Sequence, residues 1–419
     1  MKTPLLILAF VVFAHASYAQ KDTLYLSFEE AEKTFLQNNL SLVASKYNID
    51  ASTALIKQAK LWDNPVLLTD QTLYDGKFFR HSKLSDGSQV GEIYVQVQQL
   101  IRTAGKIRKL STLATTNAHI SELQFEQVMF NLRYTLKNDL YQSNQLLLSI
   151  NLYEKENEQL KKLLTAMNAQ LQAGNISQKD FLRIQSLQAS TLQEQNEYRK
   201  QLSDVQSELH TLLQSIDHSF VKAILPTTID ITRPAADSVL AFAMQNNPDY
   251  LLEKANLLYS RNSLDYQRAL RKPDVTVGVE YDKVNSYVPN YYGLTLALPL
   301  PFINRNQGNI ASAAFTVKQQ ETLVNQRGFK LTNDINNALN KLQLNLDLQK
   351  SIDPDFIRKY DLLMQNAFNA YLQRQMNLLD FLDLFEAYKN TQLKYLQQQF
   401  NLQTAKEDIN LLAGRDVIK

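Results

Sequence analysis

The sequence predicts a mainly helical α+β fold in which one unit of helix, strand pair, long helix and return helix occurs twice. Three observations predict it: a long internal repeat, a stretch of helical periodicity with almost no breaking residue, and short regions in which apolar and polar residues alternate. With 10 glycines in 419 residues, glycine lies well below its usual ~7%. Few turns and long helices follow from this composition.

Two phrases of the sequence recur about 200 residues apart. Gln37–Leu40 (QNNL) returns as Gln245–Pro248 (QNNP), 208 residues later (245 − 37), and Asp180–Leu182 (DFL) returns as Asp380–Leu382, 200 residues later (380 − 180). A period this long indicates a duplicated domain rather than a stack of short repeats. We therefore expect a first repeat over residues 20–225 and a second over 226–419, which together form one intertwined domain.

The N-terminus has the features of an export signal. An apolar run from Leu5 to Ala14 follows Lys2, and the small residues Ser17 and Ala19 precede the expected cleavage before Gln20. The run is shorter than the ~20 apolar residues of a membrane-spanning helix. The sequence predicts a Sec-type signal peptide over residues 1–19 and an exported protein.

Composition excludes several classes of function. The chain has no cysteine, which rules out disulfides, thiolate metal sites and a lipid anchor on cysteine. The chain has 44 Lys+Arg and 42 Asp+Glu, so it lacks the excess of positive charge that is typical of proteins that bind nucleic acid. The five histidines have no ligand spacing, and no nucleophile elbow or phosphate loop occurs. We expect no metal site, no cofactor and no enzyme activity.

Each repeat is expected to begin with a helix that a proline ends. Ser27 and Glu30 form the pattern of a capping box, and the helix that follows should run to about Leu61, before Pro65. In the second repeat the corresponding helix should run from Asp237 to Arg271, before Pro273.

Strands are expected where apolar and polar residues alternate along the chain, with a period of two residues. In Val275–Asp282 the apolar residues are all odd-numbered, and Ile93–Gln98 and Tyr292–Leu298 alternate in the same way. The segments Asp75–Gly91 and Lys283–Asn290 are rich in turn-forming residues and should connect the strands. Each repeat thus contributes one β-hairpin.

The hairpins have two interpretations. One is a small half-buried sheet in a soluble domain. The other is part of an outer-membrane barrel, which the export signal, the strand length and the apolar faces favour. The predicted strands are flanked by tyrosines: Tyr74, Tyr281, Tyr287, Tyr291 and Tyr292. Because a barrel needs about eight strands, four strands require oligomerisation, and three copies would supply twelve.

The longest helix is expected over Ala104–Gln172, where Gly105 is the only glycine or proline. At 1.5 Å per residue it would reach ~100 Å, which suits a conduit across a periplasm or a plain coiled-coil spacer. The return helices should start after Ser177 and after Asn377, and Pro354 should interrupt the second long helix, which starts near Ile310.

Together these features resemble the TolC-like outer-membrane efflux family over essentially the whole mature chain. The run Leu298–Gly308 (LPLPFINRNQG) is similar to the signature of its heavy-metal efflux branch. The resemblance implies a homotrimer whose twelve-stranded outer-membrane β-barrel, with four strands per protomer, continues as a periplasmic α-helical coiled-coil tunnel. It also implies a periplasmic adaptor and an inner-membrane pump of the RND type as partners.

The resemblance assigns candidate site residues at the two helical turns. Asp380 and Asp383 resemble the acidic rings of the periplasmic gate, and Asp180 and Tyr371 fall on positions that help to hold it closed. The family's gate arginine is replaced by Met376, so that Arg374 would have to substitute. An alternative for the two acids is ordinary pairing with a helix N-terminus. The exposed turns should contact the adaptor through Gly174, Asn175, Ile176, Ser177, Gln375, Met376 and Asn377.

The sequence therefore predicts the outer-membrane component of a tripartite efflux system that exports heavy-metal cations. An outlet for drug efflux or type I secretion is the alternative within the same fold. A periplasmic coiled-coil scaffold without a pore is the alternative from another class.

Overall fold

The computed structural model describes residues 23–74, 85, 91–215, 219–225, 231–283, 288–353 and 355–418. The predicted signal peptide over residues 1–19, Tyr287, Pro354 and most of the predicted connection between residues 75 and 91 lie outside the described residues. The chain forms two compact units: unit 1 contains residues up to Val43, Val128–Asn247 and residues from Leu331 on, and unit 2 contains Ala44–Gln127 and Pro248–Lys330. Each unit takes segments from both halves, and the expected repeat boundary at residue 225 stays a prediction.

The first helix begins as predicted but is not continuous. Ser27 caps helix α2 (Phe28–Asn38), and its reciprocal bonds with Glu30 complete the predicted capping box. The expected single helix to Leu61 is wrong, because the helix ends at Asn39 and a second helix, α3 (Leu40–Ala59), follows. The Asn39 side chain accepts from the backbone N–H groups of Ser41 and Leu42, so it starts α3 where α2 stops.

The second half breaks at the corresponding place. The predicted helix over 237–271 is divided into α6 (Ala236–Asn246) and α7 (Pro248–Leu270), with Asn247 between them. Pro248 occupies the first position of α7, where the missing N–H costs nothing. This expectation of one helix is therefore also wrong.

The two helix breaks, at Asn39 and at Asn247, explain why the Gln-Asn-Asn motif is repeated. The Asn39 amide donates to the backbone oxygen of Leu212 at 3.0 Å, and the Asn247 amide donates to that of Leu412 at the same distance. Leu212 and Leu412 lie in the last turns of the two return helices, whose final carbonyls have no partner within the helix. Each asparagine thus lies between two helices and satisfies a carbonyl of the return helix.

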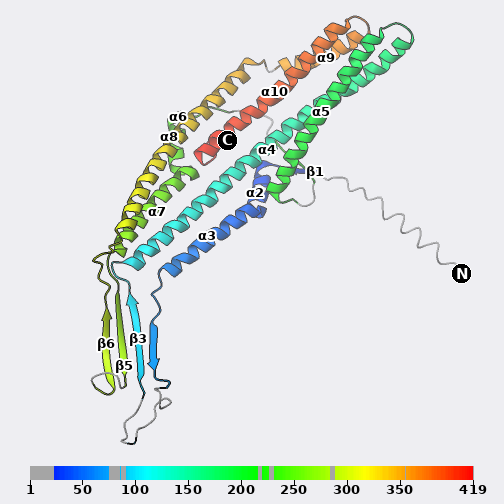
Figure 1. Ribbon diagram of the computed structural model, residues 1–419. Helices are drawn as coiled ribbons and strands as arrows, with labels where there is room; N and C mark the ends of the chain where they lie inside the picture. Colours follow the sequence, from blue (N-terminus) through cyan, green and yellow to red (C-terminus); the bar gives the residue numbers. More distant parts are fainter. Residues whose placement is uncertain are drawn as a thin grey trace, which may run out of the picture. The chain divides into compact units, whose positions relative to one another are not determined.

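The four predicted strands form one sheet in unit 2. They are β2 (Val66–Gln71), β3 (Ile93–Ile101), β5 (Val275–Asp282) and β6 (Tyr291–Ala297), in the order β2-β3-β5-β6, and all neighbours are antiparallel. Figure 1 shows the strands side by side. One predicted hairpin comes from each half, and the pairing of β3 with β5 joins the two hairpins into one sheet.

The two faces of the sheet differ in chemistry. One face carries a hydrogen-bonded polar group, in which Tyr94 donates to Glu280 at 2.8 Å and Gln96 donates to Thr295 at 2.8 Å. The other face is apolar and exposed in the single chain, with Val97, Val279, Tyr292 and Leu294. Exposed apolar surface of this kind marks a contact with lipid or with protein.

The long helices occur as predicted. Helix α4 (Lys106–Gln172) is continuous over 67 residues, about 100 Å at 1.5 Å per residue, and α5 (Gln178–Leu213) returns along it. In the second half α8 (Gln307–Ser351) and α9 (Phe356–Leu372) are separated near residue 354, and α10 (Leu378–Ala413) returns.

Two short strands, which pair with each other, were not predicted from the sequence. Strand β1 (Thr23–Leu26) pairs in parallel with β4 (Phe220–Ala223) in a two-stranded sheet of unit 1. Four residues are too few for an alternating pattern to stand out. Gln206 of α5 holds β4, because its amide accepts from the Val221 N–H at 2.8 Å and donates to the Val221 oxygen at 2.9 Å.

Within the described part of the chain, no helix combines the length and the apolar character needed to cross a membrane.

Candidate functional site

The predicted site residues lie at the ends of two helical hairpins of unit 1, where α4 turns into α5 and α9 turns into α10 (Figure 1). The two turns share one backbone design. Gly174 and Arg374 adopt the left-handed conformation, with φ of 70° and 60°. The next N–H, of Asn175 or Gln375, reaches back to the carbonyl of Gln170 or Ala370 at 2.9 or 2.8 Å. Both helices therefore end in a Schellman motif.

Each return helix starts with a capped aspartate. The Asp180 N–H donates to the Ser177 hydroxyl at 3.1 Å, and the Asp380 N–H donates to the Asn377 side chain at 2.9 Å. In turn, the carboxylates of Asp180 and Asp380 accept from these two side chains at 2.8 and 2.7 Å. In the single chain Asp380 therefore pairs with the N-terminus of its helix, which is the alternative to a gate role. Asp383 is exposed one turn further along α10.

Tyr371 joins the two hairpins through its ring and its hydroxyl. The ring stacks on Phe381 with centroids 5.0 Å apart, and the hydroxyl lies 3.9 Å from the Met167 sulfur on α4. Burial, together with the nearby Asp180 carboxylate, raises the pKa of Tyr371 above its ordinary value. The structure therefore brings Tyr371 and Asp180 into electrostatic contact.

Arg374 and Met376 lie at the same turn but have different surroundings. The Arg374 guanidinium donates to the side-chain oxygen of Gln170 at the end of α4, and Asn175 donates to the same oxygen at 3.0 Å. Met376 packs against the apolar core of the tip. Arg374 thus connects the two turns through an amide and not through an aspartate.

An apolar cluster fixes both turns. It includes Leu163 and Ile184 of the first hairpin and Phe368, Phe381 and Phe385 of the second, and Ile176 and Met376 from the turns pack against it. Because each hairpin contributes large side chains, the two hairpins are held together at their ends.

A buried polar layer lies next to this cluster, and sequence reasoning missed it. Lys389 of α10, which is 4% exposed, binds Glu194 of α5 at 2.9 Å and Glu386 at 3.0 Å. Tyr153 of α4 donates to Glu194 at 2.9 Å. Glu156, 3% exposed, also lies here. In the sequence these residues look like the charges of any solvated helix face.

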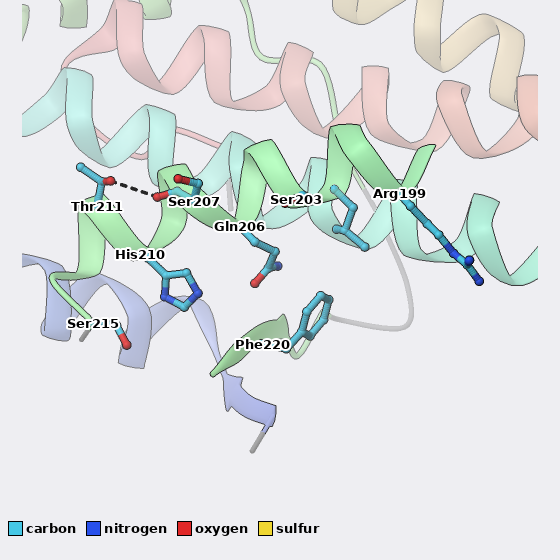
Figure 2. Close-up of a pocket in the computed structure, with 9 residues that line it drawn as sticks. Arg199, Ser203, Gln206, Ser207, His210, Thr211, Ser215 and Phe220 are labelled. Atoms are coloured by element: carbon cyan, nitrogen blue, oxygen red, sulfur yellow. Dashed lines mark hydrogen bonds between the residues drawn. The ribbon is translucent and has the colours of Figure 1, made fainter. Parts of the chain in front are cut away.

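A groove of about 630 Å³ lies on α5 beside β4 (Figure 2). Two of its polar groups serve the fold: Gln206 holds β4, and the Thr211 hydroxyl donates to the Ser207 oxygen at 3.0 Å. Over the described residues, no group of three or more His, Asp or Glu side chains has an arrangement that could hold a metal ion.

Comparisons with known proteins agree with this architecture. Residues 33–214 match the model of the family described as outer membrane efflux protein. The cobalt-zinc-cadmium resistance protein CzcC of Cupriavidus metallidurans is 24% identical over 252 residues, which are 60% of this chain and 60% of that protein. The chain thus spans about 60% of the length of this curated relative.

Solved channels have the same fold. The outer-membrane channel OprN matches with a TM-score of 0.75 at 14% identity, over 92% of this chain and 89% of that one. CusC matches with a TM-score of 0.72 at 14% identity, over 96% of each chain.

The fold is therefore that of the outer-membrane channels. The resemblance to the TolC-like outer-membrane efflux family that the sequence predicted is confirmed by the family match and by the similarity to CzcC and CusC.

Proposed function

We propose that this chain is the outer-membrane channel of a tripartite efflux system and that its cargo is heavy-metal cations. Three copies join their four-stranded sheets into one barrel of twelve strands, and the long helices continue it as a tunnel into the periplasm. An inner-membrane pump of the RND type and a periplasmic adaptor deliver the cargo. The chain is a passage and not an enzyme.

The sheet of unit 2 carries the proposal. It has an exposed apolar face, an opposite face with hydrogen-bonded polar side chains, and two edge strands, β2 and β6. An apolar face suits lipid and a polar face suits a water-filled lumen. Open edges are a liability unless another chain pairs with them. If further copies close the sheet into a barrel, the apolar face can contact lipid, the polar face can line the lumen, and both edge strands are paired.

The cargo is inferred from sequence similarity. CzcC is described as a cobalt-zinc-cadmium resistance protein, and the segment Leu298–Gly308 resembles the heavy-metal branch. An outlet for drugs or secreted proteins would have the same fold. A strain that lacks the gene separates the two. It should become sensitive to divalent metal cations and keep its tolerance of dyes and detergents, and the reverse pattern would contradict a metal cargo.

The gate is proposed at the tips of the hairpins. Asp380 and Asp383 are three residues apart and share one helix face, so three copies would present two stacked acidic rings, which favour cations. Asp180, Tyr371 and Arg374 would hold the tips closed. The exposed turns, with Gly174–Ser177 and Gln375–Asn377, would contact the adaptor.

The two acids can be tested separately, since only one of them is also a cap partner. Asp383→Asn should weaken cation preference in single-channel recordings without a change in unfolding, because Asp383 is exposed. Asp380→Asn should weaken cation preference too, and it also alters the bonds to the Asn377 cap. Asp204→Asn, which is exposed on α5 far from the turn, serves as the control. Cation preference that is unchanged in both aspartate variants would remove these residues from the gate.

A further inference from the structure

The edges of the sheet define how a second copy must approach. Because neighbouring strands are antiparallel throughout the order β2-β3-β5-β6, β6 runs opposite to β2. If β6 of one copy pairs with β2 of the next, the two strands are again antiparallel, and the ladder continues in the same sense. The contact is head-to-tail, and repetition of one such contact closes a ring.

The chain just beyond the end of β6 is apolar and exposed. Leu300, Phe302 and Ile303 lie in the segment Leu298–Asn304, and Phe302 and Ile303 are 71% and 91% exposed. Large apolar side chains that are exposed next to one another mark a contact surface. Pro299 and Pro301 flank Leu300, and proline cannot extend a ladder. We name Leu298–Asn304 the apolar segment.

The chain just before β2 helps to form a groove that both apolar and polar side chains line. It has a volume of about 430 Å³ and is lined by Leu55 of α3, by Leu61 and Trp62 just after α3, by Leu113 of α4 and by Tyr259 of α7. Leu61 and Trp62 are 59% and 63% exposed at its rim. Asp63, which also lines the groove, is already paired with Arg102 by bonds of 2.7 and 2.8 Å. An apolar occupant would therefore bury no unpaired charge.

The register of the sheet places the apolar segment and the groove at the same end of the strands. Val66, Gln98, Gly278 and Thr295 are successive partners across the four strands, so the start of β2 lies level with the end of β6. In antiparallel pairing of β6 with β2 of the next copy, the residues after β6 continue alongside the residues before β2.

We propose that the apolar segment of each copy, with Phe302 and Ile303 as its anchors, docks into the groove between α3 and α4 of the next copy. The occupant is thus a second copy of this chain. The inference rests on the proposed function, because it assumes that β6 and β2 pair between copies. It adds a specific contact outside the barrel, at the junction between the sheet and the helices of unit 2.

Cross-linking tests the contact directly, since the chain has no cysteine of its own. The full chain is expressed in outer membranes with Ile303→Cys and Leu61→Cys, or with Phe302→Cys and Trp62→Cys, and is oxidised in the membrane. All four side chains are exposed, so the variants should fold. We expect loss of the monomer band in favour of covalent dimers and trimers on denaturing gels without reductant, and return of the monomer with reductant.

Ile303→Cys with Thr112→Cys is the matched control. Thr112 is exposed and lies about half a turn around α4 from Ala114, which lines the groove, so this protein should stay monomeric on the gel. The inference is overturned if both test pairs stay monomeric while light scattering finds a trimer, or if the control cross-links equally. A protein that is monomeric by light scattering would instead overturn the proposed function itself.

Discussion

Replacement of Glu156 by glutamine should make the protein more stable at neutral pH. Glu156 is buried, and neither of its carboxylate oxygens has a hydrogen-bond partner among the described residues. Burial raises the pKa of Glu156 from 4.5 to about 8. The charges of Glu194 and Glu386 also raise this pKa, whereas the charge of Lys389 lowers it. The folded state therefore holds Glu156 in its neutral form, which is also the form that glutamine imitates.

The sign of the pH dependence follows from this shift. Because the unfolded chain releases the proton near pH 4.5 and the folded chain releases it near pH 8, the free energy of unfolding should fall as pH rises between these values. At pH 7 the wild type should be less stable than Glu156→Gln by about 3 kcal/mol, from 1.36 kcal/mol for each pH unit. Below pH 4.5 the two proteins should have equal stability.

Helix content followed in guanidinium chloride from pH 4 to pH 9 measures this difference. Glu158→Gln is the control, because Glu158 is exposed and bound to Lys162, which lowers its pKa. Burial also raises the pKa of Asp139, to about 7. Asp139 therefore adds its own decrease in the free energy of unfolding with rising pH, at lower pH, in both the wild type and Glu156→Gln. If Glu156→Gln has the same pH slope as the wild type up to pH 8, Glu156 is charged in the fold and our account of the polar layer is wrong.

Gly414→Ala should destabilise unit 1 by about 2–5 kcal/mol, from the left-handed backbone and from overpacking. Gly414 ends α10 with φ of 70°. A Cβ at this position would overlap the backbone oxygen of Asn246 and would lie 2.7 Å from the carbonyl carbon of Asn246. The overlap is with backbone at the junction of α6 and α7, which cannot move without disturbing the Asn247 bond to Leu412.

Gln214→Ala provides the matched control. Gln214 ends α5 at the equivalent position, 200 residues earlier (414 − 214), and already carries a Cβ at φ of 53°. Its replacement removes one bond, from its amide to the Thr211 oxygen, and should cost less than about 1.5 kcal/mol. Equal losses in the two variants, measured by denaturant unfolding at one pH, would show that the close approach at Gly414 has no energetic consequence.

Much of the fold could be predicted because its signals are local. The period-two pattern of Val275–Asp282 gave β5 with its exact bounds, and the scarcity of glycine and proline after Gly105 gave the length of α4. The breaks at Asn39 and Asn247 could not be predicted in this way. An asparagine does not by itself end a helix, and here its effect depends on a carbonyl more than 160 residues away.

The candidate site was predictable in its turns but not in its contacts. The sequence offered pairing of Asp380 with a helix N-terminus as an alternative, and the structure contains that cap at Asn377. The partner of Arg374 is Gln170 of the other hairpin, and no local pattern points to it. Lys389 and Glu156 are buried only because two hairpins pack against each other, so their charges could not be told from those of an exposed face.

The central claim is that three copies share one barrel in a membrane. The measurement that tests it most directly is the protein mass of the mature species, extracted from outer-membrane fractions in mild detergent and determined by light scattering with the detergent subtracted. We expect the mass of three chains, and aggregation when the detergent is removed, because the apolar face of the sheet needs cover. A monomer or dimer that stays dispersed without detergent would contradict the channel and would favour the periplasmic scaffold.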